Sequence, residues 1–212
     1  MRNYSIIFTV GRMNPPTPGH FYLIEKMLEE ALGNDVKKIH IILSSKTDSK
    51  KNPLEPEEKR YILETYGVPY AKRSLARNYP DFKTEIDEIA VDILLTHEHN
   101  KYFQNDIMTS VKHVLCQRRK GERVLFVGGD EFPLNRSIDR VLLDRTENPI
   151  SGTIVRTIAQ LSFYPFAAIY APFGICQREL RIMYEAINEL ELSDKKREAI
   201  AYMRARYPLR RG

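Results

Sequence analysis

The residues best suited to chemistry lie in one short segment near the start of the chain, from Gly11 to His20. Within it, Arg12 offers a cation, Thr17 a hydroxyl and His20 an imidazole. Three prolines stiffen the segment, while Gly11 and Gly19 let the backbone approach a ligand without a Cβ in the way. Because a stiff loop that leads into a helix N-terminus suits phosphate, the segment predicts an anion site.

A second group with similar chemistry lies far downstream, from Ile150 to Arg156. Ser151 is a natural helix N-cap. Thr153 and the positive end of the helix dipole would then face an anion. Arg156, one turn further on, can bind phosphate oxygens through both arms of its guanidinium. Alone, this pattern also fits an ordinary capped helix. Taken with the first segment, a second phosphate-contacting loop becomes the favoured interpretation.

The two segments resemble the two signatures of the nucleotidyltransferase superfamily. The first signature is usually His-x-Gly-His, and here Thr17 stands where the first histidine is expected. The pattern Asn-Pro-x-Thr-x-x-His, which begins at Asn14, is similar to the eukaryotic branch of nicotinamide mononucleotide adenylyltransferases. The run from Ile150 to Arg156 matches the second signature, Ile-Ser-x-Thr-x-x-Arg, at every specified position.

This resemblance implies that a phosphate-bearing small-molecule acceptor attacks the α-phosphate of a nucleoside triphosphate in line, and that pyrophosphate leaves. Its catalytic residues are then His20, Arg156 and Lys50. Mg²⁺ is expected to arrive on the substrate phosphates rather than in a protein cage, because no cluster of carboxylates is present in the sequence. The residues implied in nucleotide binding are Gly11, Arg12, Asn14, Thr17, Gly19, His20, Gly128, Asp130, Ile150, Ser151, Thr153 and Arg156.

The loop at residues 44–54 is polar, and its composition alone fits a solvated loop. Its Lys-Lys-Asn-Pro-Leu run, however, resembles a segment of phage- and virus-type members of the same superfamily. That resemblance assigns Lys50, Lys51 and Asn52 to the phosphate of the acceptor, with Arg12 and either lysine neutralising charge at the reacting centre.

Residues 128–132 spell Gly-Gly-Asp-Glu-Phe, which is also the signature of diguanylate cyclases. In that family an apolar strand follows the motif, whereas here Pro133 follows it, and proline cannot donate to a central ladder. We therefore interpret Gly128 to Asp130 as a turn after a strand, where Asp130 can accept hydrogen bonds from a ribose or a base edge.

The substrates stay open between three alternatives. The form of the first signature and the Ile-Ser-Gly-Thr form of the second favour adenylyl transfer from ATP to nicotinamide mononucleotide, which gives NAD. The phage-like loop keeps cytidylyl transfer to another phosphorylated acceptor open. A nucleotide-binding regulator that has lost turnover is the third alternative.

The elements that position these residues follow from hydrophobic patterning. Runs rich in apolar residues predict strands at 5–10, 38–43, 123–127 and 138–145. Helical spacing predicts amphipathic helices at 82–94 and 103–115, within a helical insertion at about 68–117. Gly33 and Asn34 suit a left-handed cap of the first helix. The expected fold is α/β, a Rossmann-like parallel sheet of about five strands with helices on both faces.

The expected organisation is a nucleotidyltransferase core at 1–161 and a small C-terminal helical appendage at 162–212, with helices at 177–190 and 193–207. An apolar stripe on these helices fits either core packing or self-association, so a homo-oligomer stays open. The pair His97 and His99 is interpreted as structural rather than metal-binding, because residues two apart on a helix end point in different directions.

Composition limits the functional classes. The 212 residues contain 42% hydrophobic residues and no long apolar run, so we expect no membrane partner. The N-terminus shows no secretory signal, and Cys116 and Cys176 are expected to be free, buried thiols, which favours a cytoplasmic protein. The net charge of +5 comes from dispersed lysines and arginines, and a polyanionic small ligand explains it better than nucleic acid.

Overall fold

The structure is a computed structural model that describes residues 4–47, 52–98, 106–129, 132, 134–135, 137–144 and 150–188. Its five strands form one sheet in the order β3-β2-β1-β4-β5, and every neighbouring pair is parallel. This confirms the predicted α/β, Rossmann-like fold. The strands are β1 (Tyr4–Gly11), β2 (Lys38–Leu43), β3 (Ala90–Leu95), β4 (Arg123–Gly128) and β5 (Asp139–Leu142).

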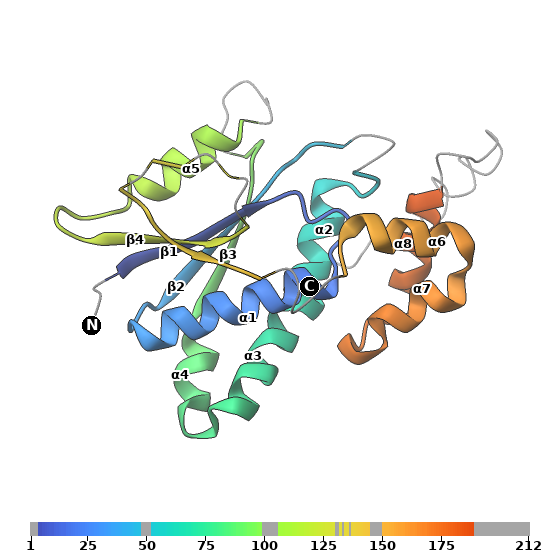
Figure 1. Cartoon of the computed structure of the whole chain (residues 1–212), viewed down its shortest axis with the longest axis horizontal. Helices are drawn as coiled ribbons and strands as arrows, with labels where there is room; N and C mark the ends of the chain where they lie inside the picture. The colour runs from blue at the N-terminus through green and yellow to red at the C-terminus, as the bar shows by residue number, and fades with distance from the viewer. Residues whose placement is uncertain are drawn as a thin grey trace.

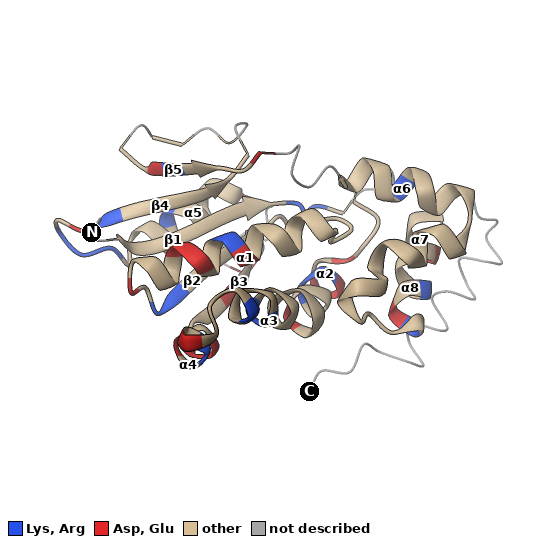
Figure 2. Cartoon of the chain, turned by 60° about the horizontal axis from the view of Figure 1, so that its bottom comes forward, with Lys and Arg blue, Asp and Glu red and all other residues tan. Residues whose placement is uncertain are grey.

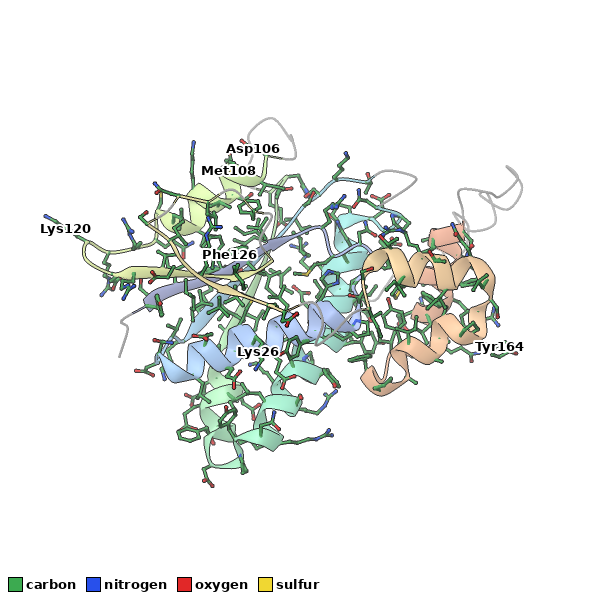
Figure 3. The ribbon with its side chains drawn as sticks, in the orientation of Figure 1. Lys26, Asp106, Met108, Lys120, Phe126 and Tyr164 are labelled. Atoms are coloured by element: carbon green, nitrogen blue, oxygen red, sulfur yellow. The ribbon has the colours of Figure 1, made fainter. Side chains whose placement is uncertain are left out.

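Both faces of the sheet are buried, which explains why its central strands are nearly continuous apolar runs. On one face a large apolar cluster contains Ile7 of β1 and Ile41 of β2. On the other face a smaller cluster contains Phe8 and Phe126, whose ring centroids lie 5.5 Å apart at an edge-to-face angle of 62°. The phenylalanines of β1 and β4 therefore pack directly on each other, and Figure 3 shows Phe126 in the middle of the sheet.

Helices cover both faces of the sheet (Figure 1). Helices α1, α3 and α4 lie on one side, and α5 lies on the other, while α2 stands near the carboxyl edge. The helices between the strands are α1 (Pro18–Gly33), α2 (Pro56–Ile62), which continues through a π-helical turn (Leu63–Gly67) into α3 (Val68–Asn78), then a 3-10 turn (Pro80–Phe82), α4 (Lys83–Glu88) and α5 (Ile107–Leu115).

The predicted helix at 82–94 is wrong in its second half. Helix α4 ends at Glu88, and Ala90–Leu95 forms β3, at the edge of the sheet beside β2. Ile86, Ile89 and Ile93 fit helical spacing, but a short apolar run cannot be assigned to helix or strand by periodicity alone. The predicted insertion therefore contains a strand of the sheet as well as helices.

Helices α6 (Gly152–Leu161), α7 (Phe163–Tyr170) and α8 (Gln177–Asn188) gather beyond the carboxyl edge of the sheet, with a 3-10 turn (Ala171–Phe173) between the last two (Figure 1). Phe163 and Phe166 pack against Tyr184 of α8, with ring centroids 5.3 and 5.7 Å away. Tyr164, by contrast, projects outward from α7 and is 83% exposed (Figure 3). The predicted helix at 193–207 lies outside the described residues.

Two smaller expectations need correction. Helix α1 ends at Gly33 as predicted. The residue with left-handed backbone geometry is Asp35 (φ 54°), however, and not Gly33 or Asn34. Cys116 and Cys176 are free thiols as expected, but both are exposed rather than buried: Cys116 is the C-cap residue of α5, and Cys176 directly precedes α8.

Positive and negative side chains are spread over many elements (Figure 2). This distribution agrees with the interpretation that the net positive charge is dispersed. Among the residues that the structure describes, no helix combines the length and the apolar character needed to cross a membrane.

Candidate functional site

The candidate residues lie at the carboxyl edge of the parallel sheet, around β1. In this strand order β1 pairs with β2 on one side and with β4 on the other. The chain leaves β1 towards β2, so the loops that follow β1 and β4 diverge, and ligands of open α/β sheets bind at such a switch point. Strands β1, β2 and β4 end here at Gly11, Leu43 and Gly128.

The loop after β1 is tightly built. Met13 is buried, and its φ of 44° lies in the left-handed region that non-glycine residues rarely adopt. A Cβ on Gly11 would lie 3.3 Å from the Met13 Cγ, so glycine here leaves room for the methionine side chain. Arg12, between them, is exposed. The loop therefore turns its apolar side chain inward and its cation outward.

Thr17 and His20 form one hydrogen-bonded unit at the start of α1. Thr17 is the N-cap, and its backbone N–H donates to the Nδ1 atom of His20 at 2.9 Å. The Thr17 hydroxyl lies 3.0 Å from the same nitrogen. Burial lowers the pKa of His20 to about 4, so the ring is neutral at pH 7. Since Nδ1 accepts, we assign the ring proton to Nε2, which can donate to a phosphate oxygen.

Asn14 joins the loop after β1 to the loop after β2. Its side-chain Nδ2 donates to the carbonyl oxygen of Leu54 at 2.9 Å, and its Oδ1 accepts from the Leu54 N–H at 3.0 Å. Asn14 is 5% exposed, so both bonds are shielded from water. The residue that the resemblance assigned to the nucleotide therefore also fixes the position of the next loop.

Tyr170 of α7 supports the same loop from the C-terminal helices. Its hydroxyl donates to the carbonyl oxygen of Pro16 at 2.6 Å, and the side chain is fully buried. Burial raises the pKa of Tyr170, so the hydroxyl keeps the proton that it donates. Sequence reasoning missed this residue, because a tyrosine in an aromatic run carries no signal for a hydrogen bond to a distant loop.

The second signature begins α6 as predicted. The Ser151 Oγ accepts from the Ile154 N–H at 3.3 Å, which confirms the N-cap. Arg156 donates through Nη2 to the Thr153 Oγ1 at 3.2 Å. A Cβ on Gly152 would lie 3.2 Å from the Arg156 Nη1, so the absence of a side chain there leaves space for the guanidinium.

Arg156 also brings the two signatures together. Its Nη1 donates to the backbone carbonyl oxygen of Asn14 at 3.1 Å, across 142 positions of sequence. Gly152 lies close to the same carbonyl oxygen, since a Cβ on this residue would be 3.7 Å from it. The loop before α1 and the first turn of α6 are therefore direct neighbours.

The remaining predicted residues have less direct links to the two signatures, or lie outside the described part of the chain. A Cβ on Gly128 would lie 2.8 Å from the Phe126 ring, so this glycine has a packing role. Ile150 is half-buried beside the second signature, and Asn52 is buried before α2. Gly19 is half-buried in the first turn of α1, and the other predicted site residues, Lys50, Lys51 and Asp130, lie outside the described residues.

A polar group at the ends of β2 and β3 was not predicted as part of the site. The Ser45 N–H donates to the Thr96 Oγ1 at 2.8 Å, and the Ser45 Oγ lies 2.7 Å from the His97 Nδ1. The other ring nitrogen of His97 lies 3.6 Å from Glu57 of α2. His97 thus follows a strand rather than a helix, and the missed β3 is the reason that its position at this edge was overlooked.

One comparison bears on this geometry. The model of the family described as Cytidylyltransferase-like matches residues 8–158, which begin within β1 and end within α6. The matched range contains both signatures and all the loops described above. No curated protein matches the chain.

Proposed function

The chain belongs to the cytidylyltransferase-like family, and we propose that it transfers a nucleotidyl group from a nucleoside triphosphate to a phosphorylated small-molecule acceptor. Pyrophosphate is the second product. The observation that carries this proposal is the hydrogen bond from the Arg156 Nη1 to the Asn14 carbonyl oxygen, at 3.1 Å. It supports the proposal because it holds together two segments that are far apart in sequence and that each suit phosphate.

In this proposal the protein works by positioning and charge rather than by a covalent intermediate. The acceptor phosphate is itself the nucleophile, so the site must hold two anionic substrates in line and offset their repulsion. His20 donates through Nε2 to the α-phosphate, where negative charge grows in the transition state. Arg156 and Thr153 hold the outer phosphates that leave as pyrophosphate, and the exposed Arg12 adds positive charge at the reacting centre.

Mg²⁺ fits this site as a companion of the substrate. Within the described ranges no group of three or more histidine, cysteine or acidic side chains lies together. The phosphate oxygens and water are therefore its expected ligands. When bound, the ion neutralises phosphate charge; the residues of this chain orient the phosphates that carry it.

For the substrates we propose ATP and nicotinamide mononucleotide, with NAD as the product. Support comes from the Asn-Pro-x-Thr-x-x-His arrangement, in which Asn14 holds the neighbouring loop and Thr17 caps the helix and bonds to His20. Cytidylyl transfer to another phosphorylated acceptor is the second candidate. The bonds between Asn14 and Leu54 favour it, because they tie the phage-like Asn-Pro-Leu segment to the site.

The test is to incubate the purified protein with each nucleoside triphosphate, Mg²⁺ and a panel of phosphorylated acceptors, and to follow pyrophosphate release. The proposal predicts release that requires both a triphosphate and an acceptor, with ATP and nicotinamide mononucleotide as the best pair. Release with CTP would select the second candidate. Nucleotide binding without release for any pair would show a regulator that has lost turnover.

His20→Ala is the variant that assigns this activity to the described site. We expect kcat to fall by about 10² or more with a smaller change in KM, because the contact strengthens in the transition state. Near-normal kcat in this variant would place the chemistry elsewhere.

A further inference from the structure

A buried lysine stands behind the loop that follows β2. Lys59 of α2 has no exposed surface, and its Nζ donates to the carbonyl oxygen of Ser44 at 2.6 Å. Ser44 directly follows β2, and its own N–H donates to the carbonyl oxygen of Gly11 at 3.0 Å. The ammonium therefore lies at the carboxyl edge of the sheet, one hydrogen bond from the end of β2 and linked through Ser44 to the end of β1.

The positive charge of Lys59 is only partly compensated. An ammonium has three N–H donors, and within the described part of the chain it makes the single bond to Ser44. Glu55 and Glu57 act on it through space without an ion pair, and burial lowers the pKa of Lys59 to about 8. Removing a cation from water costs several kcal/mol unless close partners offset it. A neutral donor could hold one carbonyl oxygen without that cost.

We propose that Lys59 provides a fixed positive charge for the phosphate of the acceptor, on the β2 side of the site. This inference rests on the proposed nucleotidyl transfer. The loop after β1 and the start of α6 are assigned to the triphosphate, so the end of β2 remains for the second anion. A buried charge is weakly screened, and it therefore attracts a phosphate without having to touch it. Lys59 is thus a positioning residue, which acts together with the Ser44 carbonyl that it holds.

Lys59→Met tests this role, because methionine fills a similar volume without charge. We expect the KM for the acceptor to rise at least tenfold and the KM for the nucleotide to change less than twofold. The unfolding midpoint should change little, since relief of a partly compensated buried charge offsets the loss of the bond to the Ser44 carbonyl oxygen. A lysine with a purely structural role would instead lower stability and weaken both substrates equally, and that result would overturn the proposal.

Lys72→Met is the matched control. The Lys72 Nζ also donates to a backbone carbonyl oxygen, that of Asp87, at 2.8 Å, and burial lowers its pKa too. It belongs to α3 and binds α4, on a covering face of the sheet rather than at the edge with the site. We expect this variant to leave both KM values unchanged. An equal rise in the acceptor KM would mean that removing any lysine has this effect.

A binding measurement on the intact wild-type chain tests the charge without turnover or folding of a variant. Sulfate is a dianion that does not titrate near pH 8, so calorimetry in two buffers of different ionisation enthalpy reports protons taken up by the protein. Sulfate beside Lys59 should raise its pKa above about 8, so at pH 8 the protein should take up a measurable fraction of a proton, at most about half. Glu55, Glu57 and His97 are the other titratable groups nearby, and the same titration on His97→Asn removes the contribution of the histidine.

These outcomes separate the two proposals. Sulfate binding without proton uptake would overturn the role of Lys59 while leaving nucleotidyl transfer untouched. Proton uptake in a protein that shows no turnover with any substrate pair would refute the proposed function and leave a buried anion-binding lysine. Turnover together with an unchanged acceptor KM in Lys59→Met would again overturn the role of Lys59 and leave the proposed nucleotidyl transfer standing.

Discussion

Removal of the Tyr170 hydroxyl is expected to weaken the loop after β1 from its far side. Tyr170→Phe keeps the buried ring and deletes the donor that lies 2.6 Å from the Pro16 carbonyl oxygen. Both residues are buried, so water cannot easily replace the lost donor. Leaving a buried acceptor unsatisfied costs about 1–3 kcal/mol. We expect the free energy of unfolding to fall by about that amount, which for a chain of this size lowers the midpoint by about 2–4 °C for each kcal/mol.

The assay is urea unfolding of the wild type, Tyr170→Phe and the control Tyr184→Phe. Tyr184 lies in the same helical unit and packs on Phe163 and Phe166, but within the described residues its hydroxyl makes no hydrogen bond. We expect the control to lose less than about 0.5 kcal/mol. Equal losses in the two variants would refute the argument, because the contact with Pro16 would then have no special value.

Three further expectations concern the loops themselves. Gly152→Ala places a Cβ 3.2 Å from the Arg156 Nη1 and should weaken nucleotide binding several-fold by calorimetry, whereas Gly33→Ala, which meets no atom within 4 Å, should not. Asn14→Asp loses the amide donor and buries a charge, so it should lower the free energy of unfolding by about 2 kcal/mol or more in urea titrations. The pKa of His20 is about 4 in the folded state and 6.5 when exposed, so the unfolded state binds the extra proton first. The free energy of unfolding of the wild type should therefore fall as the pH is lowered from 6.5 to 4, and His20→Gln should lack that part of the pH dependence in urea titrations.

Much of the fold was predictable from the sequence because buried parallel strands are apolar on both faces. The run from Lys38 to Leu43 contains no acidic residue and one histidine, and it matches β2 at both ends. The edge strand β3 was missed because Asp92 interrupts its apolar run and because isoleucines before it continue a helical spacing. The strand pairs with β2, which is distant in sequence, and this pairing brings the Asp92 Oδ2 to 3.1 Å from the His40 Nδ1. No local sequence pattern contains that information.

The candidate site was predictable where local chemistry is specific. Ser151 had to cap a helix, and the structure places it at the N-cap of α6. The residues that hold the loops were not predictable, since Tyr170 and Lys59 reach them only through tertiary packing. Both are buried polar groups whose partners are backbone carbonyl oxygens, and such partners leave no trace in side-chain spacing.

The central claim is that the two distant signatures form one phosphate-binding site, and a double-mutant cycle tests it most directly. The cycle compares kcat/KM for His20→Ala, Arg156→Lys and the double variant, where lysine keeps the charge of Arg156 but loses its planar fork. Since both residues act on one triphosphate, the losses should be non-additive, with a coupling free energy of about 1 kcal/mol or more. Losses that add to within about 0.3 kcal/mol would contradict the claim, because residues that do not share a ligand act independently.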